Sequence, residues 1–224
     1  MIRIIAKMCL LVAFLFAAVT AQAGNILSNG DFQTGTLPPW TPFTTTNGTN
    51  GAGLPDVVLF NTTGTGPSLA AQFDVGEVAY TGLPEGGAID ESFTLSSGGT
   101  FTFFANIASQ DDANHLVNAD AGTYSILIDG VPLASDNLGG FSSVDQILMG
   151  TLSGSVSLSA GAHTLEVLIT RDFLSNGTAT PEEYVDNIAL TATPEPGTLA
   201  VAALALMGLA FYRRKCSIAK HAAR

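Results

Sequence analysis

Carboxylates occur throughout this sequence, and they form no catalytic pattern. A glycosidase needs two carboxyls at a set separation across a cleft. The 19 acidic residues are so widely spread that no pair stands out, and Glu182 and Glu183 are typical of a solvated pair. His115 and His163 accompany neither a G-x-S-x-G turn nor a cysteine nucleophile. No glycine-rich phosphate loop or H-E-x-x-H sequence occurs either. The sequence therefore predicts a protein that is not an enzyme.

The stretch Ser109–Ala121 is rich in oxygen ligands, which suit hard cations such as calcium. It contains Asp111, Asp112, Asn114, Asn118 and Asp120. The order of a calcium-binding EF-hand loop is absent, because no glycine follows at the sixth position from Asp112 and no glutamate at the twelfth. We expect a solvated loop that joins two strands.

Aromatic side chains offer a second kind of chemistry, because the apolar C–H face of a sugar packs against a flat ring. Trp40, the single tryptophan, and Tyr80, which lies in a glycine-rich segment, are the candidate glycan-binding residues. The alternative for Trp40 is a place in the hydrophobic core. Tyr80 is the better candidate for an exposed ring.

Charge is distributed unevenly between the ends of the chain and its middle. Seven of the eight Lys and Arg residues lie in the two ends, whereas residues 24–193 contain Arg171 and 18 acidic residues, a formal charge of −17. Such a surface repels phosphate backbones, which argues against nucleic acid as a partner. The only cysteines, Cys9 and Cys216, lie in the ends, so the middle has no disulfide and no thiol chemistry.

The first 23 residues have the three parts of a secretory signal peptide. Arg3 and Lys7 form its basic region, Met8–Val19 is a twelve-residue apolar run, and Ala21-Gln22-Ala23 supplies the small residues of a cleavage site. We expect signal peptidase to cut before Gly24. The alternative, an uncleaved anchor helix, is disfavoured because the apolar run is short.

The C-terminal region has three successive features. Pro194-Glu195-Pro196 cannot continue a strand or helix and predicts a stiff, extended segment. An apolar run, Leu199–Tyr212, follows and predicts a transmembrane helix over about residues 198–212. Arg213, Arg214 and Lys215 come next and are expected to stop transfer and stay cytoplasmic.

These three features together resemble the PEP-CTERM sorting signal, over residues 194–215. The resemblance implies an exported protein of a bacterial envelope whose tail is recognised by an exosortase, a membrane-embedded processing enzyme. It also implies an association with exopolysaccharide and biofilm matrix. The alternative is a plain C-terminal membrane anchor.

The middle of the chain has the pattern of an antiparallel β-sandwich. Apolar and polar residues alternate through Ala88–Ala108, with a break at Ser96–Gly99. Thr123–Leu133 alternates as well and contains Asp129-Gly130, a strong hairpin turn signal. Further strands are expected within 151–158, 163–170 and 184–191. Many short strands with glycine turns and no intervening helix favour an all-β sandwich.

The opening segment Asn25–Gln33, followed by Trp40, resembles the start of carbohydrate-binding-module-like jelly rolls of the galactose-binding type. Tyr184–Leu190 resembles their last strand. The resemblance implies a jelly-roll fold in which the first and last strands pair. It does not by itself imply a function, because such sandwiches serve binding, adhesion and spacing alike.

The same resemblance implies a structural calcium ion between the opening strand and the last. The matching positions are Gln33 and Asp186, with the neutral Gln33 where the family tends to have Glu. Asp31 is a third ligand candidate, because strand alternation would place it on the same face as Gln33. The alternative is an ordinary solvated turn.

Four regions follow from these observations: a signal peptide (1–23), a β-sandwich domain (24–193), a sorting signal (194–215) and a basic cytoplasmic tail (216–224). The leading hypothesis is an exported surface or matrix protein that does no chemistry and binds exopolysaccharide. A ligand-free spacer or coat protein is the alternative. A weak glycan hydrolase is a third hypothesis, and it requires convergent carboxylates in a deep pocket.

Overall fold

The computed structural model describes residues 24–111, 120–175 and 181–193, with residues 205 and 208 in addition. Within it, Asn25–Ala192 forms a compact unit of its own. The predicted signal helix lies outside the described residues, as do residues 112–119 of the predicted oxygen-rich loop. The predicted membrane helix over 198–212 also lies outside them, apart from Ala205 and Gly208, which are helical. None of the described residues belongs to a helix that is long and apolar enough to cross a membrane.

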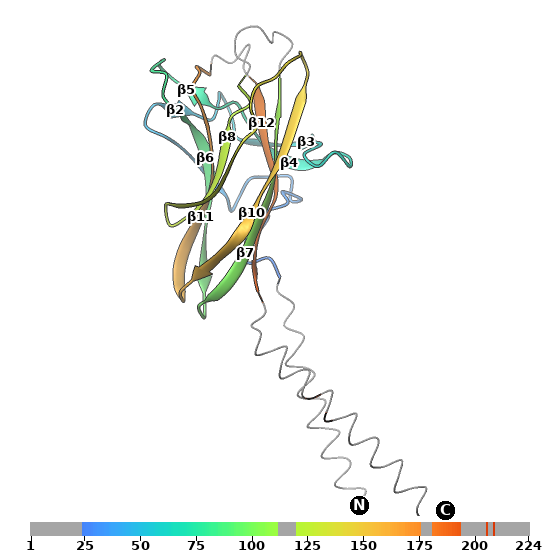
Figure 1. Cartoon of the computed structure of the whole chain (residues 1–224), viewed down its shortest axis with the longest axis vertical. Helices are drawn as coiled ribbons and strands as arrows, with labels where there is room; N and C mark the ends of the chain where they lie inside the picture. Colours follow the sequence, from blue (N-terminus) through green and yellow to red (C-terminus); the bar gives the residue numbers. More distant parts are fainter. Residues whose placement is uncertain (1–23, 112–119, 176–180, 194–204, 206–207, 209–224) are drawn as a thin grey trace, which may run out of the picture. The chain divides into compact units, whose positions relative to one another are not determined.

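Two five-stranded antiparallel sheets build this unit, as the sequence pattern predicts (Figure 1). The strands of the first sheet, in spatial order, are β1 (Thr41–Thr44), β6 (Glu85–Leu95), β11 (Gly161–Arg171), β8 (Thr123–Ile128) and β9 (Val131–Asn137). The strands of the second are β10 (Ile147–Leu158), β7 (Gly99–Gln110), β12 (Glu182–Ala192), β4 (Ser68–Phe73) and β3 (Asp56–Phe60). A short pair, β2 (Gly48–Thr49) and β5 (Gly76–Glu77), lies outside both sheets.

Alternation of side chains along each strand divides the core from the surface. On β7, Phe101 and Phe103 are buried in the core, whereas Thr100 and Thr102 between and beside them are exposed. β11 repeats the pattern with Leu165 buried and its neighbours half-buried. Among the described residues, the core between the sheets is built from residues 26–190, so this unit has a hydrophobic core of its own and is expected to fold without the chain ends.

The predicted hairpin at Asp129-Gly130 joins β8 to β9. Both residues have positive φ, 53° and 74°, which is the backbone of a type I′ turn. This turn matches the right-handed twist of the two strands, and Gly130 adopts its conformation without a side-chain penalty.

The opening segment lies against the last strand, although it forms turns and only an isolated bridge. Asn25 bridges to Thr191, and the Asn25 side chain donates to Ile188 O at 3.0 Å and accepts from Leu190 N at 2.9 Å. β12 has a register irregularity at this level, between Asp186 and Ala189. Gly30 fits there because a Cβ would lie 2.0 Å from Ile188 O.

Candidate functional site

The loop of residues 78–83, named here the Tyr80 loop, presents apolar side chains to solvent. Val78, Tyr80 and Leu83 are 66%, 67% and 60% exposed. Phe173 and Leu174, 37% and 38% exposed, lie on the segment that is hydrogen bonded to the base of the loop. Exposed apolar side chains that lie close together in a structure are more informative than scattered ones, so this loop is a candidate binding surface.

Glu77 fixes the backbone of this loop from below. Its side chain is fully buried, and its carboxylate accepts hydrogen bonds from the backbone N–H of Thr81 and, at 2.9 Å, of Leu83. Hydrogen bonds to an ionised acceptor are stronger than neutral ones. The loop is therefore held in one conformation by a carboxylate that solvent does not reach.

Asn47 and the segment after β11 hold the loop from two further sides. The Asn47 side chain donates to Ala79 O at 2.6 Å and accepts from Ala79 N at 3.0 Å, so it satisfies both backbone groups of one loop residue. Glu77 N donates to Phe173 O at 2.7 Å, and Ser175 N donates to Glu77 O at 3.1 Å. The Tyr80 ring is thus presented by a rigid backbone.

A buried ion pair contacts the backbone of Val75, two residues before Glu77, and so lies next to the base of the Tyr80 loop along the chain. Arg171 Nη1 is 3.3 Å from Glu183 Oε1, and neither side chain is exposed to solvent. Val75 contacts both: its N–H donates to Glu183 Oε2 at 2.9 Å, and its carbonyl accepts from Arg171 Nη1 at 3.1 Å. Burial raises the pKa of Glu183 to about 8, against the lowering effect of Arg171. This pair joins β11, β12 and the segment after β4. The expectation of a solvated Glu182–Glu183 pair is wrong for Glu183, which is fully buried.

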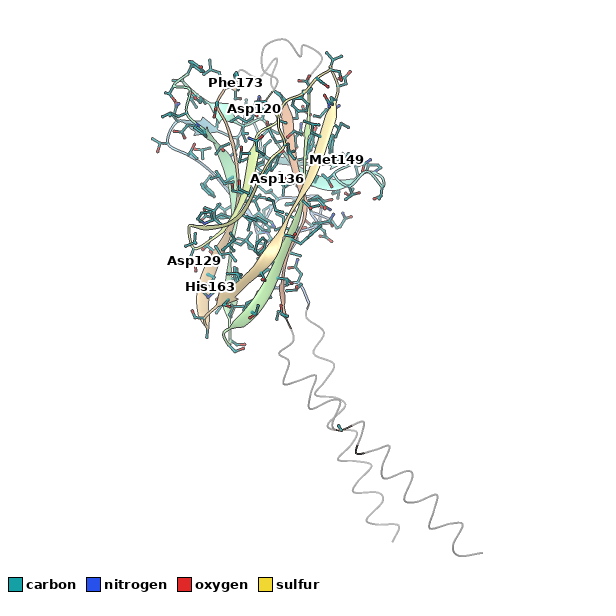
Figure 2. All side chains as sticks on the ribbon, in the orientation of Figure 1. Asp120, Asp129, Asp136, Met149, His163 and Phe173 are labelled. Carbon is teal, nitrogen blue, oxygen red and sulfur yellow. The ribbon has the colours of Figure 1, made fainter. Side chains whose placement is uncertain are left out.

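A second pair, of a carboxylate and a histidine, lies at the other end of the sandwich, where Figure 2 shows Asp129 and His163 next to each other. His163 Nδ1 is 2.7 Å from Asp129 Oδ2, and Thr164 N donates to Asp129 Oδ1 at 2.9 Å. The hydrogen bond to Asp129 raises the pKa of His163, and the same bond lowers the pKa of Asp129. The pair connects the β8–β9 turn to the start of β11.

The expectation that Trp40 serves as a glycan platform is wrong. Its side chain is 2% exposed, and its ring centroid lies 6.3 Å from that of Phe32 in the hydrophobic core. The indole Nε1 donates to Ser28 O at 3.2 Å, so its one polar group is also occupied. The alternative considered for Trp40, a place in the core, is the one observed.

The three residues of the expected calcium site differ in environment. Asp186 is fully buried and accepts hydrogen bonds from Thr62 Oγ1 at 3.3 Å, from Ser68 Oγ at 2.5 Å and from Asn187. Burial raises the pKa of Asp186, and the charge of Asp31 adds to this. Asp31 and Gln33 are exposed.

The premise that strand alternation places Asp31 and Gln33 on one face is wrong, because this segment forms turns and Phe32 between them has a φ of 51°. The Gln33 side-chain amide donates to Asp31 O at 3.0 Å. Among the described residues, no group of three or more His, Cys, Asp or Glu is placed to hold a metal ion. The calcium site stays a prediction.

The sorting residues Pro194, Glu195 and Pro196 lie outside the described residues, as do Arg213, Arg214 and Lys215. Tyr80 is exposed, as expected from the sequence, whereas Glu77 and Asn47, which position its loop, were not anticipated. A carboxylate shortly before a glycine turn is a weak signal, and Asn47 lies 33 residues from Tyr80 in the chain. Only the fold brings Asn47 to the loop.

Residues 192–215 match the family described as the PEP-CTERM protein-sorting motif. The match begins at Ala192, the last residue of β12. It identifies the chain as one that carries this sorting signal, and such chains are exported and processed by an exosortase-type enzyme.

No curated protein matches the chain. Solved structures with a similar fold include a carbohydrate-binding module in complex with β-1,4-galactotriose, with 13% identity, coverage of 76% of this chain and 100% of that one, and a TM-score of 0.45. A module from the lichenase 5A of Cellvibrio mixtus in complex with cellotriose has 17% identity, covers 62% and 88%, and has a TM-score of 0.33. A cyclase from Fischerella sp. TAU has 13% identity, covers 77% and 98%, and has a TM-score of 0.46. At these values the likenesses indicate neither ligand nor activity.

Proposed function

We propose that this exported protein binds extracellular polysaccharide through the Tyr80 loop and does no chemistry on it. The observation that carries the proposal is an exposed aromatic ring between two exposed apolar side chains on a backbone fixed by buried Glu77 and by Asn47. Sugar rings have apolar C–H faces that pack on such a ring. A loop that is already ordered loses little conformational entropy when a ligand binds.

The position of the loop supports this role. Strand β6 begins at Glu85 beside the loop, and its partner β11 ends at Arg171 at the same level. Strand β12 runs from this end, where Arg171 contacts Glu183, to Ala192 at the opposite end (Figure 1). The Tyr80 loop therefore lies at the end of the sandwich away from the residue where the sorting motif starts.

The charge of the domain narrows the kind of polysaccharide. Residues 24–193 have a formal charge of −17, so an anionic polymer is repelled unless divalent cations bridge the two. Neutral exopolysaccharides are the better ligands.

For the chain ends we infer the same processing as from the sequence. Signal peptidase removes residues 1–23, and an exosortase acts at the tail, with Pro194-Glu195-Pro196 as its recognition segment and Arg213–Lys215 as the membrane stop.

Affinity electrophoresis of fragment 24–193 in gels that contain neutral polysaccharides tests the proposal. We expect the wild type to be retarded and Tyr80→Ala to lose at least about tenfold in affinity, which corresponds to about 1.4 kcal/mol. Tyr80→Phe keeps the ring and should keep most of the affinity. Leu59→Ala is the matched control, because Leu59 is an exposed apolar residue on β3 and is 71% exposed.

Two results would contradict the proposal: no retardation of the wild type on any matrix polysaccharide, or equal losses for Tyr80→Ala and Leu59→Ala. The first would favour the spacer or coat hypothesis.

The same gels with calcium and with chelator, together with thermal melting in both conditions, test the predicted calcium ion at Asp31, Gln33 and Asp186. A calcium site raises the melting temperature of the wild type but not of Asp186→Asn.

A further inference from the structure

Strands β7 and β10 carry no charged residue, although the domain around them is strongly acidic. Each strand has twelve residues, and neither contains Asp, Glu, Lys or Arg. The outward side of β10 presents the apolar Ile147 and Met149 at its start and hydroxyl groups beyond them, with Ser153, Ser155 and Ser157 exposed. In a domain with a formal charge of −17, this is an unusually neutral surface.

β10 is also an edge strand, and its edge lacks the features that keep edges from pairing. Natural edge strands are protected by proline, by charge or by bulges. The other three edges of the sandwich have such protection: β1 contains Pro42, β3 contains Asp56, and β9 contains Pro132 and a register irregularity. β10 pairs with β7 in unbroken register from Ile147 to Leu158 and has none of these features.

We propose that β10 pairs with β10 of a second copy of this chain, so that two sandwiches share one continuous sheet about a two-fold axis. Alternate backbone N–H and C=O groups of an edge strand point away from its neighbour and are free to pair. Isologous pairing of this kind closes with two copies. It is independent of glycan binding at the Tyr80 loop.

The first residues of β10 do not take part, because β9 packs on their inward side and the bulky Ile147 and Met149 project from their outward side. A Cβ at Gly150 would be 2.7 Å from Asp136 Oδ2 of β9, and Figure 2 places Asp136 and Met149 in this part of the sandwich. The pairing segment is therefore Thr151–Leu158. With the two-fold axis close to Gly154, outward-facing residues must meet outward-facing ones, so Ser153 lies opposite Ser155 of the second copy.

If two copies of this chain associate, electrostatics favours contact at the β10 edge over contact at the charged parts of the surface. Two domains of charge −17 repel each other, and the repulsion is smallest where neither surface carries charge. Salt shortens the range of that repulsion, from about 30 Å at 0.01 M to about 8 Å at 0.15 M. The dimer should therefore become tighter as salt concentration rises.

Sedimentation equilibrium of fragment 24–193 tests the pairing, with two double variants that place charge at the proposed axis. Ser153→Asp/Ser155→Asp and Ser153→Lys/Ser155→Lys should each weaken the dimer at least about tenfold through like-charge repulsion. An equimolar mixture of the two should associate again, because the opposite charges then face each other. Ser92→Asp/Thr94→Asp is the matched control, with two exposed hydroxyl residues on the outward face of β6; it should not change the dimer.

Each outcome is decisive. A wild-type fragment that stays monomeric at every soluble concentration overturns the proposal. So does an unchanged dimer in both charged variants, or the lack of association in their mixture. Circular dichroism shows whether a variant that fails to associate is folded. If the charged variants lose retardation in polysaccharide gels while the wild type is monomeric, this face binds glycan and the proposal is wrong, whereas the Tyr80 loop is tested separately by Tyr80→Ala.

Discussion

A carboxylate pairs with a basic side chain at each end of the sandwich, but the two pairs lie in different environments. At the loop end, Arg171 and Glu183 are both fully buried. At the opposite end, the side chain of His163 is 8% exposed and that of Asp129 is 48% exposed. Both pairs connect separate segments of chain, so they differ mainly in access to water.

This difference separates what each pair contributes. A buried pair needs its partner, because a lone buried charge has a large desolvation penalty. An exposed pair is screened by water and salt and contributes little. The loop end is therefore expected to be the more rigid, which suits a surface that presents Tyr80, whereas the pair at the opposite end adds little to the turn at Asp129-Gly130.

The largest effect is expected for Arg171→Met. Above pH 8, where Glu183 is ionised in the wild type, this substitution leaves Glu183 without its charge partner and Val75 O without a donor, so the free energy of unfolding should fall by about 3–5 kcal/mol. Urea denaturation of fragment 24–193 measures it. The double variant Arg171→Met/Glu183→Leu should recover part of the loss, because no charge is then buried. A loss under about 1 kcal/mol in Arg171→Met would remove the distinction between the two ends.

The pH dependence of stability should come largely from Glu183. Its pKa is raised from 4.5 to about 8, so the folded state keeps a proton that the unfolded state releases between these values. Its contribution is fully present below pH 4.5 and is lost as pH rises through about 8, with a slope of up to about 1.4 kcal/mol per pH unit. Urea titrations across this window should show a smaller slope in Glu183→Gln; an equal slope would assign the effect to other groups.

Glu77 tests whether the loop end is rigid for the reason proposed. Glu77→Ala removes the acceptor of two loop N–H groups and should cost about 2–3 kcal/mol. Hydrogen exchange at Thr81 and Leu83 should become faster, and polysaccharide affinity should fall about as far as in Tyr80→Ala. Glu77→Gln keeps one acceptor oxygen and should lie between. Unchanged exchange at both amides would show that the loop is held by other contacts.

The smallest effect is expected for Asp129→Asn, at less than about 1 kcal/mol. The raised pKa of His163 makes the contribution of the pair complete below pH 6.5 and lost as pH rises through the folded value. The lowered pKa of Asp129 removes it again as pH falls below 3.8. The change should therefore be largest between pH 3.8 and pH 6.5 and should shrink as pH rises through the raised pKa of His163. Asp172→Asn, at another exposed carboxylate, is the control. If Asp129→Asn lowered the free energy of unfolding more than Arg171→Met does, the comparison between the two ends would be reversed.

The strands that the sequence predicts are those with regular alternation. β6, β7, β8, β10, β11 and β12 all follow the expected segments, because a half-buried strand needs apolar residues at every second position. β1 to β5 were not predicted. They lie in a stretch rich in Thr and Gly, where short strands such as β1 are defined by their partners in the sheet and not by their own pattern.

The candidate site divides in the same way. Tyr80 could be selected from sequence because a tyrosine in a glycine-rich segment is often exposed, and it is 67% exposed. Trp40 could not be assigned, since the same residue type suits a binding platform or a core, and here it fills the core. Glu77 and Asn47 were missed because their partners are backbone amides, which leave no mark in a sequence.

The sequence by itself determined the sorting signal, the sandwich class and the acidity of the domain, because these depend on local composition and on the periodicity of single strands. Tertiary structure alone decided which charges are buried, which edge strand is unprotected and what holds Tyr80 in place. These properties depend on contacts between residues that are far apart in the chain, such as Arg171 with Val75 or Asn47 with Ala79. Only the packing of the two sheets creates such contacts.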